Sequence, residues 1–271
     1  MRFTFLGTGT SAGVPAIGST NAAAYSDDPR DRRLRTSACL RFSDDRGQDR
    51  TILLDCGPDL RQQALAHNLT RCDAVLFTHN HVDHTWGVDE LRRFNVLMDA
   101  PIDLFAEPRT IEHLGRVYQH IFDHELNVQK SFVARVIAHT IAPDVSFELF
   151  GLRITPVRLL HGKLPIVGFR FDPGKGSAER PLLPLAYCTD VSGIPPETWP
   201  QLRGLKHLVL DGLRYRKHPT HFTIPQAAEA ADRIEAGRTW LVHMSDDVVH
   251  AEAEAELPEN IRLAFDGLEL S

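Results

Sequence analysis

Six consecutive residues, His79-Asn80-His81-Val82-Asp83-His84, carry three imidazoles and one carboxylate. Neutral imidazole and carboxylate oxygen are together suited to borderline divalent ions such as zinc, manganese and iron. A solvated, histidine-rich loop is the alternative interpretation of such a stretch. Four potential ligands on one short turn favour a metal site over a solvated loop, and the stretch therefore predicts a metal site.

The residues before this stretch support a metal site. Residues 73–78 form an apolar run, which is typical of a buried strand. The cluster therefore begins where a strand is expected to end. In layered α/β proteins a rigid sheet can direct several loop side chains toward one point at such strand ends. This context argues against the solvated loop.

Three further potential ligands are placed in the same way. His161 follows the apolar run 154–160, Asp190 follows 185–189, and His243 follows 240–242. Each is a weak signal alone, because a single histidine at a strand end is more often structural. Their shared position after a strand predicts that they join one site.

The hydrophobic pattern predicts strands and helices in both halves of the chain. Strands are expected at residues 2–6, 37–43, 50–55, 73–78, 132–138, 145–150, 152–158, 166–171, 183–188, 207–210, 239–243, 261–264 and 268–270, and helices at 58–66, 87–98, 108–122, 225–236 and 247–256. Thr223 is a predicted helix N-cap with Gln226 three residues later. No repeat and no disordered linker divides the chain, so residues 1–271 are predicted to form a single domain, with two sheets packed face to face and helices outside.

Residues 7–36 lack helical or strand periodicity and are predicted to form a long loop. Its second half contains Arg30, Arg32, Arg33 and Arg35 interspersed with Asp27, Asp28 and Asp31. A local basic patch is one interpretation of this segment. The alternating acids favour a solvated loop instead.

The overall composition excludes several classes of protein. The formal net charge of −6 provides no general attraction to nucleic acid or anionic membrane. The four cysteines are scattered, which favours free thiols in a reducing cytosol over a disulfide framework. No apolar stretch approaches the length of a membrane span or a signal peptide. The expected location is the cytoplasm, with no membrane partner.

The order and spacing of these motifs resemble the metallo-β-lactamase superfamily, from Leu6-Gly7-Thr8-Gly9 through Asp55 to His243. The resemblance implies an α/β fold, the αββα four-layer sandwich. It also implies two divalent metal ions per chain, zinc or manganese, with iron as a further option. One ion is assigned to His79, His81 and His161, the other to Asp83, His84 and His243, with Asp190 bridging them. Asp55 resembles the acid that orients a ligand histidine, and Asp83 is also counted as a catalytic residue.

A second group of motifs indicates which reaction within the superfamily the chain catalyses. Residues 209–214 and 218–223 resemble the branch that contains the PhnP-like cyclic phosphodiesterases and, more distantly, the tRNA 3′-end processing nucleases. The resemblance makes His221 the candidate general acid, with His218 second; a histidine that caps a helix or contacts water is the alternative. Asp211 either orients His221 or organises a loop, and Arg214 is a candidate phosphate contact.

The chain departs from the PhnP-like pattern at a structural zinc site. In that family three cysteines and one histidine hold this zinc after a Gly-Val-Pro motif. The corresponding residues here are Ser19, Asn21, Ala24 and Asp246. We therefore predict no structural zinc, and no obvious replacement orders residues 16–36.

The predicted activity is that of a dinuclear metal-dependent hydrolase acting on small or cyclic phosphodiesters. A metal-bridging hydroxide is the expected nucleophile and His221 the expected acid. A glyoxalase II-like thioesterase or lactonase is the alternative. A tRNA 3′-processing nuclease is less favoured, because no basic, glycine-rich arm is inserted, and a non-catalytic metal-binding protein is disfavoured by the full ligand set. The expected partner is a small-molecule phosphodiester rather than nucleic acid, and the resemblance makes a homodimer plausible.

Overall fold

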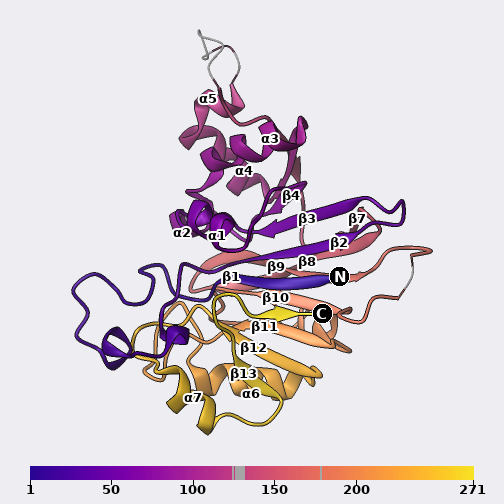
Figure 1. The fold of residues 1–271 in the computed structure, drawn as a ribbon. Helices are drawn as coiled ribbons and strands as arrows, with labels where there is room; N and C mark the ends of the chain where they lie inside the picture. The colour runs from indigo at the N-terminus through magenta and orange to yellow at the C-terminus, as the bar shows by residue number, and fades with distance from the viewer. Residues whose placement is uncertain (124, 126–131, 178) are drawn as a thin grey trace.

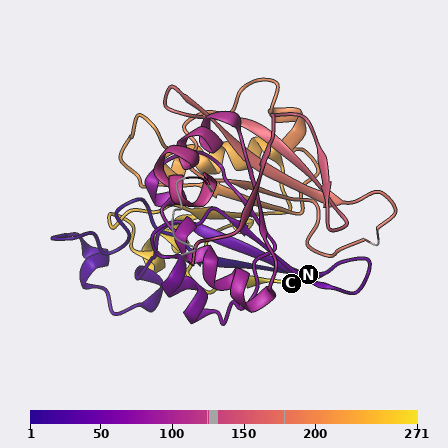
Figure 2. The same cartoon turned by 90° about the horizontal axis from the view of Figure 1, so that it is seen from above.

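In the part of the chain that the structure describes, two mixed, seven-stranded sheets are stacked face to face, with helices on both outer faces (Figure 1). The computed structural model describes residues 1–123, 125, 132–177 and 179–271. This is the αββα sandwich that the resemblance implied. The two termini lie side by side in both views (Figures 1 and 2), because the last strand pairs with the first.

The first sheet joins the N-terminal strands to the final strand. Its order is β14 (Glu269–Leu270), β1 (Arg2–Gly7), β2 (Ser37–Ser43), β3 (Asp49–Leu54), β4 (Ala74–Leu76), β5 (Ile102–Ala106) and β6 (Val136–Thr140). Strands β14 to β3 run antiparallel, and β3 to β6 run parallel. Parallel strands end at one edge, so the residues after β3 and β4 emerge on the same side of the sheet.

The second sheet contains the remaining strands of the described residues. Its order is β13 (Ile261–Leu263), β12 (Arg238–Val242), β11 (His207–Asp211), β10 (Leu185–Cys188), β9 (Leu164–Pro173), β8 (Leu152–His161) and β7 (Phe147–Leu149). Strands β10 to β13 run parallel and β7 to β10 antiparallel. The carboxyl ends of β10, β11 and β12 therefore also share one edge.

Buried apolar side chains form three layers between the four layers of structure. The central layer lies between the sheets and contains Phe3, Leu54, Ile154, Phe169 and Val209. Helices α1 (Leu60–Ala66), α3 (Leu91–Met98) and α4 (Pro108–Val117) cover the first sheet, while α6 (Ile224–Ile234) and α7 (His250–Glu256) cover the second. The short helices are α2 (Val82–Thr85), α5 (Gln119–Phe122), η1 (Ala22–Tyr25), η2 (Pro29–Asp31), η3 (Val88–Glu90) and η4 (Trp199–Leu202). The predicted capping box at Thr223 and Gln226 is confirmed.

The segment between residues 87 and 122, where two helices were predicted, also contains a strand between them. It contains β5, which pairs with β4 on one side and β6 on the other. This strand was not predicted, because residues 102–106 are a short apolar run between two helical patterns, and periodicity alone does not assign such runs. The helices predicted around it are each divided, into η3 and α3 and into α4 and α5. Residue 124 lies outside the described residues.

The prediction of a solvated loop is wrong for Arg33. Its side chain is fully buried and pairs with Asp31 at 2.7 Å between Nη2 and Oδ1. Its guanidinium also donates to the carbonyl oxygens of Ser245 and Val248 at 3.3 and 3.0 Å. The alternating pattern could not reveal this pair, because both partners lie within one loop and their burial depends on residues 212 or more positions later. Arg33 thus ties the long loop to the segment that follows His243.

The residues aligned with the family's zinc site contact one another through hydrogen bonds. Asn21 Nδ2 donates to Asp246 Oδ1 at 2.9 Å and to Asp247 Oδ1 at 3.0 Å. Although burial acts the other way, hydrogen bonds from Ser19 and Asn21 lower the pKa of Asp246. These contacts order a segment for which the sequence offered no obvious replacement for zinc. The lack of structural zinc itself stays a prediction.

Among the described residues, no helix combines the length and the apolar character needed to cross a membrane.

Candidate metal centre

The predicted ligands meet at one edge of the sandwich, where strands of both sheets end. His79 lies three residues after β4, His161 ends β8, Asp190 lies two residues after β10, and His243 follows β12. Asp190 and His243 have left-handed backbone angles, with φ of 58° and 65°. Non-glycine residues rarely adopt this conformation, and it is concentrated at functional sites. The sheets thus bring together side chains that are far apart in the sequence.

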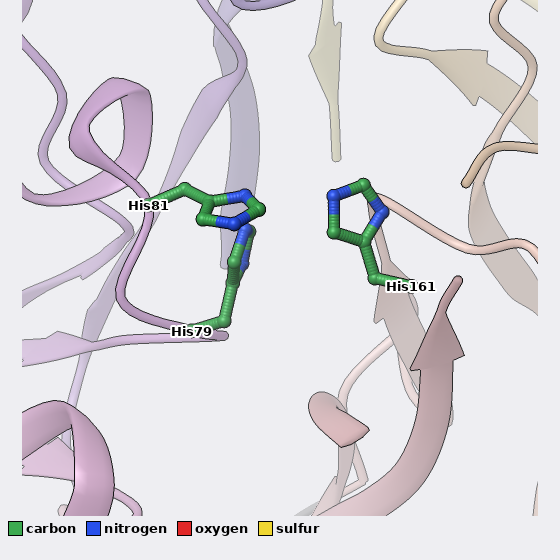
Figure 3. A group of neighbouring side chains, drawn as sticks. All are labelled: His79, His81 and His161. Carbon is green, nitrogen blue, oxygen red and sulfur yellow. The ribbon is translucent and has the colours of Figure 1, made fainter. Parts of the chain in front are cut away.

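Three histidines form the first ligand group. His79, His81 and His161 each offer a nitrogen, and these nitrogens lie within 4.8 Å of one another. Figure 3 shows His79 and His81 on one segment and His161 opposite, with the rings turned toward a common space. His79 and His161 are buried and His81 is exposed, so the group opens to solvent on one side.

Two aspartates and two histidines form the second ligand group. Ligand atoms of Asp83, His84, Asp190 and His243 also lie within 4.8 Å of one another, and all four residues are buried. Asp190 Oδ2 is 3.1 Å from His84 Nε2, and Asp190 Oδ1 is 3.3 Å from His243 Nε2. Asp190 also lies within 4.8 Å of His161 in the first group. The predicted bridging residue therefore contacts both halves of the site.

Hydrogen bonds set the ring orientation of three histidines. Thr78 Oγ1 donates its only proton to Asp55 Oδ2 at 2.9 Å, so it accepts from His79 Nδ1 at 3.0 Å. His161 Nδ1 donates to the Thr220 carbonyl oxygen at 2.7 Å. With Nδ1 protonated in each ring, Nε2 carries the lone pair that a metal requires.

Asp55 orients the third ring, that of His84. Its Oδ2 accepts from His84 Nδ1 at 2.8 Å, while Oδ1 accepts from the Thr78 backbone N–H at 2.8 Å. Asp55 is fully buried at the end of β3 and has a left-handed φ of 60°. Outer residues that hold a ligand histidine in this way fix its tautomer and increase its basicity.

The donor set fits divalent metal ions. His79 Nε2 is buried and lacks a hydrogen-bond partner among the described residues, while the Nε2 atoms of His84 and His243 face only the carboxylate oxygens of the second ligand group. Buried polar atoms without partners are rare in folded proteins, and a bound cation would account for His79 Nε2 and for the carboxylates gathered around the other two rings. The imidazole and carboxylate ligands suit zinc, manganese or iron. The number of ions and the ligand role of each residue stay predictions.

The electrostatics of the centre also favour cations. Against the effect of burial, the carboxylates of Asp190, Asp83 and Asp55 raise the pKa of His84 well above its ordinary value. Burial lowers the pKa of His79 well below its ordinary value, so this ring is neutral near pH 7. The carboxylates thus attract positive charge to the site, and metal ions would compete with protons for the nitrogens.

His221 approaches this centre from the second sheet. Its Nδ1 is 2.7 Å from Asp211 Oδ2, and one ring nitrogen lies within 4.8 Å of ligand atoms of His161 and Asp190. Asp211 Oδ2 also accepts from the Val191 backbone N–H at 2.7 Å. Asp211 therefore both orients His221 and organises the loop after β10, the two roles that the sequence left open.

Burial shifts both members of this pair toward their neutral forms. It lowers the pKa of His221 to about 4 and raises the pKa of Asp211 well above its ordinary range. His221 is therefore a neutral imidazole near pH 7 in the absence of substrate. Since Nδ1 faces Asp211, Nε2 is the atom available to a substrate.

Sequence reasoning missed Thr78 and Thr220, which orient His79 and His161. In the sequence, Thr78 precedes the predicted ligand His79, and Thr220 precedes the candidate general acid His221. These positions alone did not indicate a role, because threonine is common at such turns. The other candidates lie near the centre without joining a ligand group. His218 is close to His221, with ring centroids 5.2 Å apart, and Arg214 contacts Asp247 at 3.6 Å.

Known proteins resemble this chain in sequence and in fold. A family model described as "Beta-lactamase superfamily domain" matches residues 50–244. A crystal structure described as a new diphosphatase from the PhnP family superposes with a TM-score of 0.87 and 37% identity, covering 100% of this chain and 97% of that one. Zn²⁺-bound PqqB from Methylobacterium extorquens superposes with a TM-score of 0.73 and 24% identity over 100% of both chains, a likeness of fold alone.

A curated octanoyltransferase of Porphyromonas gingivalis is 35% identical over 271 residues. The match covers 99% of this chain and 51% of that protein. The chain therefore spans about half the length of this relative. The name octanoyltransferase describes the longer protein, about half of which lies outside the match.

Proposed function

The chain belongs to the beta-lactamase superfamily, and from that premise we propose that it is a dinuclear metal-dependent phosphodiesterase acting on small phosphodiesters. It is an enzyme of a metal-dependent hydrolase superfamily, and its PhnP-family neighbour is a diphosphatase. The finer assignment, to phosphoric diesters, rests on the residues around the metal centre.

The hydrogen-bonded pair of His221 and Asp211 is the observation that carries the proposal. Asp211 holds Nδ1 at 2.7 Å, which leaves Nε2 directed to the substrate side. A phosphodiester is anionic, and negative charge beside an imidazole favours its protonated form. Substrate binding would therefore raise the proton affinity of His221, which then donates to the leaving alkoxide.

Seven residues would hold the metal ions: His79, His81, Asp83, His84, His161, Asp190 and His243. When bound, two divalent ions supply Lewis acidity and a water of lowered pKa. Asp83, assigned as both ligand and catalytic residue, lies 3.2 Å from His84 Nε2 and 3.8 Å from His243 Nε2. It is thus placed to accept a proton or to bind a cation at the second ligand group.

A glyoxalase II-like thioesterase or lactonase on the same fold is the alternative. A thiolate leaves without a proton, so thioester hydrolysis has no use for the buried pair of His221 and Asp211, whereas a lactone releases an alkoxide and could use it. A tRNA nuclease is disfavoured by the net charge of −6 and by the absence of a basic insertion between the motifs. Assays with different substrates distinguish both alternatives from a phosphodiesterase.

A substrate panel tests the proposal. Metal-loaded protein is expected to hydrolyse bis(p-nitrophenyl) phosphate and a cyclic nucleotide, and to act poorly on lactoylglutathione and a chromogenic lactam. A chelator should abolish the phosphodiester activity, and added zinc or manganese should restore it. Good thioester turnover without phosphodiester turnover would overturn the proposal.

A further inference from the structure

One buried ligand histidine, His243, has no partner yet for the ring nitrogen that does not face the metal centre. The other buried ligand histidines do have such a partner, from Thr78 to His79, from Thr220 to His161 and from Asp55 to His84. Nε2 of His243 lies 3.3 Å from Asp190 Oδ1, within the second ligand group. Its Nδ1 is buried and lacks a hydrogen-bond partner among the described residues.

The carboxylate of Asp211 lies beside His243. Asp211 ends β11 and pairs in register with Val242 of β12, the residue before His243. The backbone N–H of Gly212 donates to the Val242 carbonyl oxygen at 2.9 Å, which extends this pairing by one residue. An oxygen of Asp211 and a ring nitrogen of His243 lie within 4.8 Å of each other. Two neighbouring parallel strands thus bring the carboxylate and the ligand histidine to the same place.

Only one oxygen of the Asp211 carboxylate has partners among the described residues. Oδ2 accepts from the Val191 backbone N–H at 2.7 Å and lies 2.7 Å from His221 Nδ1. Oδ1 is buried and lacks a hydrogen-bond partner among the described residues. Buried polar atoms without partners are rare in folded proteins. Asp211 and His243 thus each have one such atom, an oxygen that accepts and a ring nitrogen that can donate.

The rings of His221 and His243 are stacked next to this carboxylate. Their centroids are 4.7 Å apart, and their planes are inclined by 15°. An oxygen of Asp211 and one nitrogen from each ring all lie within 4.8 Å of one another. Two nearly parallel rings at this spacing can present their Nδ1 atoms to the two oxygens of one carboxylate. This arrangement suits an acid that is shared between two imidazoles.

We propose that Asp211 positions the metal ligand His243 as well as the general acid His221, with Oδ1 accepting from His243 Nδ1–H directly or through one water. The inference rests on the proposed two-metal function. A single water can join polar atoms at this separation. A proton held on Nδ1 leaves the lone pair on Nε2, the atom that faces the second ligand group.

One shared carboxylate would fix the general acid relative to the metal ligands. The proton donor must reach the atom that leaves the phosphorus, so its placement relative to the bound phosphate matters for the rate. Although burial raises the pKa of Asp211, a cation at the second ligand group favours its carboxylate form. Asp211 is therefore a positioning residue for two histidines with different tasks.

Asp211→Asn tests the shared carboxylate, because one end of an amide accepts and the other donates. The amide oxygen takes the place of Oδ2, where two N–H groups require an acceptor. The amide nitrogen then takes the place of Oδ1 and donates to His243 Nδ1, which moves the ring proton to Nε2. Zinc affinity is measured by competition with a chromophoric chelator. We expect one of the two binding steps to weaken about 10–100-fold, the usual effect of losing such an outer partner, and the other to change little.

His221→Phe is the matched control. It keeps an aromatic ring against His243 and removes the nitrogen that contacts Asp211 Oδ2. Both zinc-binding steps should stay within a few-fold of those of the wild type. Equal weakening in the two variants would show that Asp211 affects the metal centre only through His221, which would overturn the inference. Unchanged zinc affinity in Asp211→Asn would overturn it as well.

A measurement on the wild-type protein keeps the inference testable if Asp211→Asn does not fold. Proton–nitrogen correlation spectra of the zinc-loaded protein should show a proton on His243 Nδ1 that exchanges slowly with solvent. A His243 ring without a proton on Nδ1, or with one that exchanges as fast as a ring proton of the exposed His81, would contradict the proposed contact. A wild-type chain that binds fewer than two zinc ions would overturn the proposed two-metal function instead.

Discussion

His221→Ala should lower kcat for a cyclic nucleotide by about 10²–10⁴-fold, the usual contribution of a general acid. The leaving group in that substrate is an alkoxide, which needs a proton as the bond to phosphorus breaks. His221 is held by Asp211 at 2.7 Å and is adjacent to the ligands His161 and Asp190. From the segment between β11 and α6 it is thus well placed to deliver this proton. Steady-state kinetics on metal-loaded protein measure the effect.

The leaving group provides the control within the same variant. The p-nitrophenolate ion is a weak base and leaves without a proton. His221→Ala should therefore reduce turnover of bis(p-nitrophenyl) phosphate much less than turnover of the cyclic nucleotide. If both substrates lose activity equally, His221 acts in binding or structure. If neither loses more than a few-fold, the general-acid assignment is wrong.

Arg33→Ala should lower the free energy of unfolding by about 3–5 kcal/mol, the usual cost of removing one partner of a buried ion pair. The substitution leaves the carboxylate of Asp31 buried without its cation. It also removes the donor to the carbonyl oxygens of Ser245 and Val248. Urea denaturation followed by circular dichroism, at fixed metal concentration, measures the change.

Arg30→Ala is the matched control for Arg33→Ala. Arg30 pairs with Asp28 at 2.6 Å, with the same spacing of two residues in the same loop. Its side chain is 39% exposed, so water replaces the lost contact and stability should change little. Equal effects of the two substitutions would show that burial of Arg33 is not what stabilises the loop.

The ligands could be predicted because each lies at the end of a strand with a strong apolar pattern. His161, Asp190 and His243 follow such runs, and strand ends of stacked sheets converge at one edge. Strand β5 could not be assigned in this way, because its five residues carry no period that separates a strand from a buried helix. The strands that end at a metal ligand were therefore predictable from the sequence. The boundary between helix and strand around β5 was not.

The supporting residues of the site were less predictable. Thr78 and Thr220 act through a hydroxyl and a backbone carbonyl, for which their residue type provides no particular signal. The burial of Arg33 depends on carbonyl groups more than 200 positions away in the sequence. Contacts of this kind are set by tertiary structure, so local patterns contain no information about them.

Metal titration of metal-free protein tests the central claim most directly. Phosphodiesterase activity and bound metal, measured by mass spectrometry, are followed together as zinc or manganese is added. The two ligand groups predict that activity reaches its plateau at about two bound ions per chain, as in two-metal hydrolytic sites. Full activity without metal, or a plateau at one bound ion, would contradict the account.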